Sequence, residues 1–195
     1  MSTLTSTATM EFTIRRKVLQ IFGASFHIYN PDGSLYGYCK QKALKLKEDI
    51  RIYTDESMQT ERLRIAARQI IDFSAADDVV SSTTNQKIGA FQRKGWTSIL
   101  KDTWLVLNEH DQEFAKIEED GTVLALVRRV VDLGFLIPQS FHLYDSERRP
   151  LAQFRTHFNP FIHRMTVTVP PGANVDPQLV LAAGILLVAI EGRQT

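Results

Sequence analysis

The stretch that decides the fold is DPQLVLAAGILLVAIEGR, residues 176–193. Asp176 is a typical N-cap residue, and Pro177 is favoured at the first position of a helix. Every residue from 179 to 190 is apolar or small, so the helix that this pattern predicts has no polar face. A helix that is apolar on all sides has to be enclosed by other apolar groups.

A bilayer is one way to enclose this helix, but the apolar segment is too short for it. Twelve residues, 179–190, form a helix about 18 Å long, whereas the hydrocarbon core of a bilayer is about 30 Å thick. We therefore expect the helix to be buried inside the protein rather than to cross a membrane.

The remainder of the chain predicts mostly β-strands. Leu44 and Leu46 alternate with Lys45 and Lys47, which is the pattern of a strand with one buried and one solvated face. Residues 122–133 are spaced instead as an amphipathic helix that Gly134 would cap. Trp104 begins an alternating run and is expected in the core. Strands are predicted at residues 12–22, 44–53, 63–71 and 163–169.

A short pattern recurs four times and predicts four β-hairpins. In each copy an apolar run leads into a polar turn, and a small residue enters the next run seven positions after the turn begins. Small residues are expected where a strand bends or another backbone comes close. Chance similarity among ordinary hairpins is the alternative to a true repeat, and it leaves the hairpins in place. The pairs are Asn30 and Gly37, Ser82 and Gly89, Asn108 and Ala115, and Asp145 and Ala152.

The first of these turns has the clearest chemistry. It reads Asn30-Pro31-Asp32-Gly33, where proline fixes φ and glycine supplies a positive φ. The chain is therefore expected to reverse at this point.

Together these elements predict a mainly β domain in which a curved antiparallel sheet closes around the C-terminal helix. Closure of the sheet would also remove exposed strand edges. No linker rich in proline or serine divides the chain. We expect residues 1–10 to form a short flexible lead and residues 11–195 to form a single domain.

Three segments resemble the Tubby C-terminal-like superfamily, especially its LURP-one-related and phospholipid scramblase branches. They are the hairpin at residues 26–38, the stretch RKGWTSILKDTWLVLNEHDQEFAKI at residues 93–117 and the closing stretch at residues 176–193. The resemblance implies a closed antiparallel barrel of about twelve strands, threaded by the hydrophobic C-terminal helix. It also implies a domain without an assigned activity, or one that binds phosphoinositides or associates with membranes, since both kinds occur in the superfamily.

The chain departs from the scramblase branch in two respects. The scramblases carry a proline-rich lead and a cysteine-rich, lipid-modified stretch, whereas this chain has a short polar lead and a single cysteine, Cys39. Lipid scrambling is therefore not expected.

Composition narrows the classes of function. The 23 Lys and Arg residues are balanced by 22 Asp and Glu residues, whereas nucleic-acid-binding proteins usually carry a marked basic excess. No nucleic-acid partner is expected. The single cysteine excludes an internal disulfide and is typical of a reducing compartment, and the first ten residues lack a signal-peptide pattern. We expect a cytoplasmic protein, at most peripheral at a membrane.

No catalytic residue, cofactor or metal is predicted. The chain has no glycine-rich phosphate loop, no nucleophile elbow and no His-Glu-x-x-His motif. His157 and His163 could approach each other, but their spacing matches no standard zinc site. Lysines near Cys39 would lower the pKa of its thiol, yet no histidine is evident as its base. Residues 118–121, EEDG, lack the pattern of an EF-hand and predict a solvated turn.

One charge asymmetry suggests a binding site. Residues 11–47 carry seven basic side chains and only two acidic ones. If the basic residues meet on neighbouring strands, they form a patch for anionic lipid headgroups. The alternative is a basic, solvated strand face without a ligand. The candidate residues are Arg15, Arg16, Lys17, Lys40, Lys42, Lys45 and Lys47, to which Arg93 and Lys94 could add.

The sequence therefore predicts a non-enzymatic domain that binds anionic phospholipid or phosphoinositide at a membrane surface. The alternative is a protein-interaction or scaffold domain without a lipid ligand. An enzyme with residues scattered over several strands is a third reading, because spacing along the chain does not reveal such sites.

Overall fold

The structure is a computed structural model that describes residues 8–17, 24–41, 49–68, 76–93, 103–120, 138–157 and 162–191. The helix predicted at residues 122–133 lies outside these ranges. So does the alternating part, residues 44–47, of one predicted strand.

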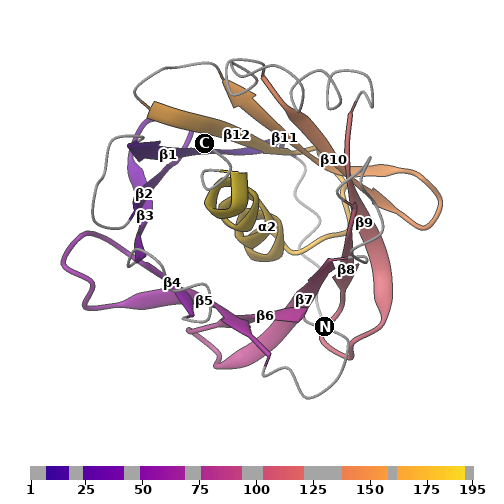
Figure 1. The fold of residues 1–195 in the computed structure, drawn as a ribbon, viewed down its shortest axis with the longest axis horizontal. Coiled ribbons are helices and arrows are strands. Elements are labelled where there is room, and N and C mark those ends of the chain that lie inside the picture. Colours follow the sequence, from indigo (N-terminus) through magenta and orange to yellow (C-terminus); the bar gives the residue numbers. More distant parts are fainter. Residues whose placement is uncertain are drawn as a thin grey trace.

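The described strands form a closed antiparallel barrel, as predicted (Figure 1). Each strand pairs with its neighbours in sequence, and the barrel closes where the first strand, β1, pairs with the last, β12. The twelve strands are β1 Met10–Lys17, β2 Ala24–Tyr29, β3 Leu35–Gln41, β4 Ile50–Tyr53, β5 Glu61–Ala67, β6 Ala76–Ser81, β7 Gln86–Arg93, β8 Thr103–Leu107, β9 Glu113–Glu119, β10 Ser140–Asp145, β11 Pro150–His157 and β12 Ile162–Val169.

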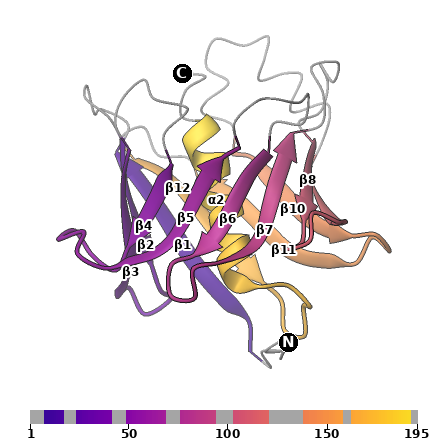
Figure 2. The same ribbon diagram turned by 90° about the horizontal axis from the view of Figure 1, so that it is seen from below.

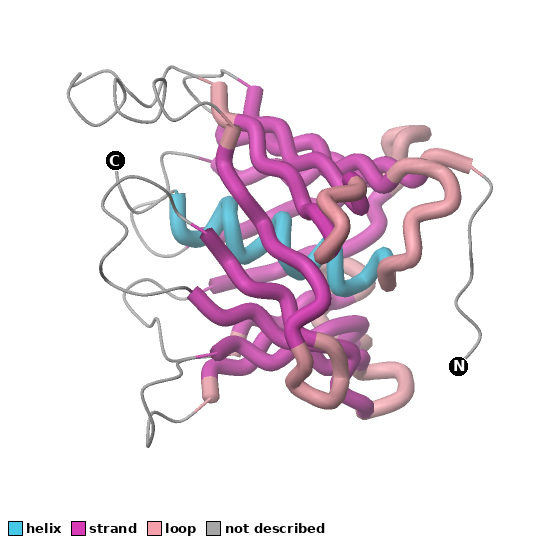
Figure 3. Tube along the Cα trace, turned by 90° about the vertical axis from the view of Figure 1, so that its right-hand side faces the viewer, coloured by secondary structure: helices cyan, strands magenta, loops and turns pink. Residues whose placement is uncertain are grey.

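The helix α2, Pro177–Glu191, runs through the inside of the barrel (Figures 2 and 3). Its N-terminus is capped as the sequence predicts, because the backbone N–H of Gln178 donates to Asp176 Oδ1 at 2.7 Å. Every residue from 179 to 189 is buried. This confirms that the apolar segment is enclosed by strands. Among the described residues no helix has the length and hydropathy needed to span a membrane.

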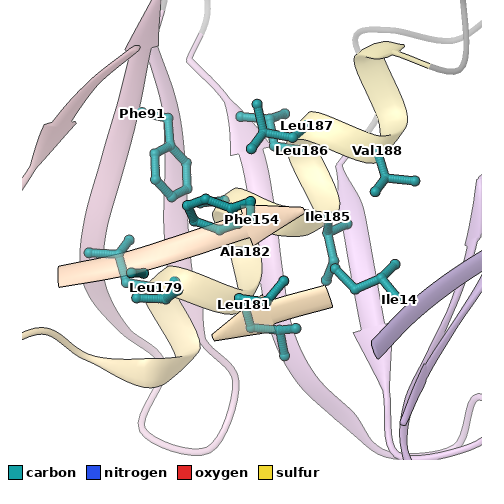
Figure 4. Close-up of a cluster of buried hydrophobic side chains, with 14 of the residues drawn as sticks. Ile14, Phe91, Phe154, Leu179, Leu181, Ala182, Ile185, Leu186, Leu187 and Val188 are labelled. Carbon is teal, nitrogen blue, oxygen red and sulfur yellow. The ribbon is translucent and has the colours of Figure 1, made fainter. Parts of the chain in front are cut away.

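The barrel wall holds the helix closely on two sides. In Figure 4, Ile14, Phe91 and Phe154 of the wall surround the helix side chains. A Cβ atom at Gly184 would lie 2.8 Å from Val167 Cγ2 of β12 and 3.0 Å from Ile14 Cδ1 of β1. The helix therefore approaches β1 and β12, the two strands that close the barrel, at a point where no side chain would fit.

The four predicted hairpins are confirmed as β2–β3, β6–β7, β8–β9 and β10–β11. Gly33 in the first turn has a φ of 83°, as the turn chemistry requires. In each hairpin one extra residue bulges from the second strand directly before the predicted small residue, which is where the sheet bends. The small residues Gly37, Gly89, Ala115 and Ala152 pair with Ile28, Val79, Val106 and Leu143.

A fifth hairpin, β4–β5, has the same construction and was missed. Leu63 pairs with Ile52 and Glu61 with Tyr53, so Arg62 is the extra residue. Residues 37, 63, 89 and 115 are spaced 26 apart, and this constant period was the signal that could have located the missing copy. The four predicted copies each have a small residue at this position, whereas the fifth has Leu63.

Strand boundaries were predicted less well than strand existence. The strand predicted at residues 44–53 is confirmed at Ile50–Tyr53, which form β4, while residues 44–48 lie outside the described residues. Strand β5 ends at Ala67, before the predicted limit of 71. Glu118 and Glu119 belong to β9, which corrects the turn predicted there. The strand continues through these two glutamates because they pair with Phe141 and His142 of β10.

Candidate anion-binding face

Strand alternation separates the first two predicted basic residues. Arg15 is exposed on the outside of β1, and its guanidinium lies 4.7 Å from the centre of the Tyr29 ring. Arg16 lies on the opposite face of the strand, 5.8 Å from the ring of the fully buried Phe26. Consecutive basic residues on a strand cannot share one face.

The other predicted residues are only partly brought together. Lys17 is the last residue of β1, and Lys40 is exposed on β3, two strands away. Arg93 is the last residue of β7, which lies across the barrel from β1 (Figure 1), so its position does not extend the surface around Arg15. Lys42, Lys45, Lys47 and Lys94 lie outside the described residues.

Barrel closure adds three basic residues that the sequence did not suggest. Arg164 on β12 is directly opposite Arg15 on β1. His157 on β11 is opposite Arg164, and Arg155 precedes it by two residues on the same face. All four side chains are exposed. We call Arg15, Arg155, His157 and Arg164 the arginine seam.

Within the part of the chain that the structure describes, no ion pair neutralises the positive charge of the seam. Among the described residues no carboxylate lies within ion-pair distance of Arg15, Arg155 or Arg164. Glu11 is on the same outer face of β1, but it is opposite Thr168, farther along the strand. Like charges directly opposite each other on antiparallel strands are destabilising. An anion bound between them would remove this repulsion.

His157 lies within this positive field. Its Nε2 is 2.8 Å from the hydroxyl of Thr166. Partial burial lowers the pKa of His157, Arg164 and Arg155 lower it further, and Glu11 opposes them. The imidazole is therefore held in its neutral form more strongly than that of an ordinary histidine.

A second pair of opposed arginines shows what a neutralised site looks like. Arg51 on β4 is directly opposite Arg64 on β5. Here Arg51 Nη1 donates to Glu61 Oε2 at 3.0 Å, and Arg51 Nη2 lies 3.7 Å from Asp49. Within the described ranges the same arrangement of arginines thus occurs twice, once with carboxylates and once, at the seam, without them.

The clearest charge network is neutralised within itself. Arg68 Nε donates to Asp78 Oδ2 at 2.9 Å, and Nη2 of the same guanidinium donates to Asp111 Oδ1. Lys87 Nζ lies 2.5 Å from Asp111 Oδ1. Lys87 and Arg68 hold the pKa of Asp111 below its ordinary value. These ion pairs tie β5, β6 and β7 to the β8–β9 turn, and their role is structural.

The remaining sequence candidates do not form a reactive centre within the described residues. Cys39 points into the core, and burial raises its pKa to about 12, so the thiolate expected from nearby lysines does not form. His157 and His163 do not converge, because His157 faces outward while His163 is paired with the inward-facing Arg16. No group of three metal-ligating side chains occurs in the described ranges. Trp104 is buried, as predicted.

A closed twelve-stranded barrel around a hydrophobic C-terminal helix defines the Tubby-like class of domains. A sequence model of the family described as LURP-one-related matches residues 37–188, so the chain belongs to this family of the Tubby-like superfamily. Members of the family are generally non-enzymatic.

One solved structure supports the fold. The chain is similar to an Arabidopsis thaliana protein of known X-ray structure, with 16% sequence identity and a TM-score of 0.55. The match covers 95% of this chain and 93% of the plant protein. No curated protein matches the chain.

Proposed function

We propose that this domain binds anionic phospholipid headgroups, phosphoinositides among them, at a membrane surface and catalyses no reaction. One observation carries the proposal: Arg15, Arg155 and Arg164 are exposed on adjoining strands without a carboxylate partner among the described residues. A basic side chain near an anionic membrane contributes about 1 kcal/mol of binding free energy. Lys40, exposed on β3, adds charge on the same side of the barrel.

The geometry suits a surface ligand better than an enclosed one. The guanidinium of Arg15 packs over the ring of Tyr29, which limits the conformational freedom of the arginine side chain. Planar guanidinium groups form bidentate hydrogen bonds with phosphate oxygens. A row of such groups on a convex barrel wall can meet several headgroups at once.

Sedimentation with vesicles tests the proposal. The protein is expected to sediment with vesicles of phosphatidylcholine containing phosphatidylglycerol or a phosphoinositide at low salt, and to be released at high salt, because exposed charges are screened. Vesicles of phosphatidylcholine alone are expected to leave it in solution. Failure to bind any anionic vesicle at low salt would overturn the proposal and favour the protein-interaction alternative.

A pair of matched double variants locates the site. Arg15→Gln with Arg164→Gln removes two seam charges and is expected to weaken vesicle binding about 30-fold, at about 1 kcal/mol per charge. Arg51→Gln with Arg64→Gln removes the same charge from another opposed pair, whose Arg51 is already paired with Glu61. That control is expected to weaken binding far less. Equal losses would show that net charge, not the seam, determines binding.

A further inference from the structure

We propose that His157 couples anion binding at the arginine seam to the uptake of a proton, so that the domain binds a membrane more tightly as the pH falls. This inference rests on the proposed function for its membrane ligand. Its structural basis is the position of His157, opposite Arg164 and two residues from Arg155, on an exposed face of the barrel.

The groups around His157 are almost all basic or neutral. On β12 it faces Arg164 and is hydrogen-bonded to Thr166. On its own strand, β11, the nearest charged residue of this face is Arg155. On β1, Arg15 lies beyond Arg164, and Glu11 is the acidic residue of the face.

Strand β10 adds no free carboxylate among its described residues. Ser140 is opposite Arg155, and His142, opposite Gln153, is paired with Asp120 at 2.8 Å. The charge of His157 in the free protein is therefore determined mainly by the seam arginines.

An anion at the seam reverses the balance of charge around His157. Without a ligand, burial and the two arginines disfavour the imidazolium form. A bound phosphate group neutralises the arginines and attracts the imidazolium directly, so the pKa of His157 is higher in the complex than in the free protein. By linkage, binding then takes up protons, and affinity rises as the pH falls through the interval between the two pKa values.

The hydrogen bond of His157 is compatible with both charge states. The Thr166 hydroxyl can donate to a neutral Nε2 and can accept from a protonated one. The histidine can therefore gain a proton without losing its contact with Thr166, and the orientation of its ring toward the seam is kept.

An NMR titration tests the coupling without a membrane. The imidazole signals of the full chain are followed against pH in sulfate and in chloride at equal ionic strength, because sulfate is an anion of constant charge over this range. The pKa of His157 is expected to be higher in sulfate. His110, exposed in the β8–β9 turn beside Glu109, is the internal control for effects of the two salts that do not depend on the seam. An unchanged His157 would overturn the inference.

Vesicle binding tests its consequence. Binding to phosphatidylcholine vesicles containing phosphatidylglycerol is expected to tighten about fivefold between about pH 7.5 and about pH 5.5, the contribution of one added charge. His157→Gln is expected to bind like the unmodified protein at the higher pH and to lose the tightening. His110→Gln is expected to retain it.

The outcomes separate the two proposals. Vesicle binding that is independent of pH, or that tightens equally in His157→Gln, would overturn the proton coupling and leave the proposed lipid binding in place. A sulfate-dependent shift of His157 with no vesicle binding at either pH would overturn the membrane function and support the proton-linked anion site.

Discussion

The inner and outer faces of β1 and β12, the two strands that close the barrel, differ in chemistry: the inner face is closely packed and apolar, and the outer face is exposed and positively charged. On the inner faces of β1 and β12, Ile14 and Val167 are fully buried and leave no room for a side chain at Gly184 of the helix. On the outer faces of the same strands, Arg15 and Arg164 oppose each other in water without a carboxylate partner among the described residues. The inner face therefore determines whether the chain folds, and the outer face is available to evolve binding at little cost in stability.

The largest effect on stability is expected when helix α2, which occupies the inside of the barrel, is removed. Deletion of residues 176–195 is expected to leave a protein that does not fold cooperatively. The described side chains of helix α2 include seven large, buried apolar ones, each worth about 1.5–3 kcal/mol. Their sum is comparable to or larger than the 5–15 kcal/mol by which a typical domain is stable. Near-UV circular dichroism and size-exclusion chromatography measure the loss of packing.

The opposite terminus provides the control for this deletion. Removal of residues 1–7, which precede the described part of the chain, is expected to leave both measurements unchanged. A C-terminal deletion that unfolds as sharply as the full chain would contradict the role assigned to the helix.

A smaller disturbance of the interior adds a single methyl group. A Cβ atom at Gly89 would lie 2.7 Å from the backbone oxygen of Leu107 and 2.9 Å from Leu179 of the helix. Gly89→Ala is therefore expected to destabilise the protein by about 1–3 kcal/mol, although glycine-to-alanine changes without a clash usually stabilise. The shift in the midpoint of urea denaturation measures this cost.

Gly37 is the matched position in another hairpin. There a Cβ atom would lie 3.1 Å from both Ile52 Cγ2 and the oxygen of Tyr53, so Gly37→Ala is expected to cost less than Gly89→Ala. A greater cost at Gly37 would show that the contact with the helix is not what restricts Gly89.

Asp77 tests how much an ionised carboxylate on the inner face of the barrel destabilises the folded protein. It is paired with the buried Phe91, and burial, with the nearby charge of Asp78, raises the pKa of its carboxyl. The ionised form is therefore disfavoured in the folded protein, and its penalty is present above the folded pKa and absent below the unfolded pKa of about 3.9. Asp77→Asn is expected to raise the urea midpoint at neutral pH, with the gain shrinking as the pH approaches 4.

Asp32 provides a control of opposite sign. Its exposed carboxylate accepts hydrogen bonds from Ser34, which hold its pKa below the ordinary value. Asp32→Asn is therefore expected not to raise the midpoint at neutral pH. A loss of stability in Asp77→Asn would mean that this carboxylate has a favourable partner when ionised.

The sequence was informative where the determining residues are close together in the chain. The hairpins follow from turns such as Asn30-Pro31-Asp32-Gly33, and the helix follows from its cap and its uninterrupted apolar run. The alternation that places Arg15 and Arg16 on opposite faces is equally local, and it separates residues that the charge asymmetry alone groups together. The seam was not predicted because Arg164 and Arg15 are far apart in the chain and meet only when the barrel closes. The sequence predicts that the barrel closes. Closure requires the first strand to pair with the last, and this pairing is what brings Arg15 opposite Arg164.

The smallest expected effect on stability is at the seam itself, and it separates packing from binding most directly. Arg164→Gln is expected to change the free energy of unfolding by no more than about 0.5 kcal/mol, because the side chain is exposed and has no ion-pair partner among the described residues. Relief of the repulsion with Arg15 favours a gain in stability rather than a loss.

A double-mutant cycle of Arg15→Gln and Arg164→Gln, measured by urea denaturation in chloride and in sulfate, isolates this repulsion from the separate surroundings of each residue. The interaction is expected to be repulsive in chloride and reduced in sulfate, since an anion held by both guanidiniums neutralises them together. A favourable interaction in chloride would mean that the two arginines already share a counter-charge, and the seam would then have no need of a ligand.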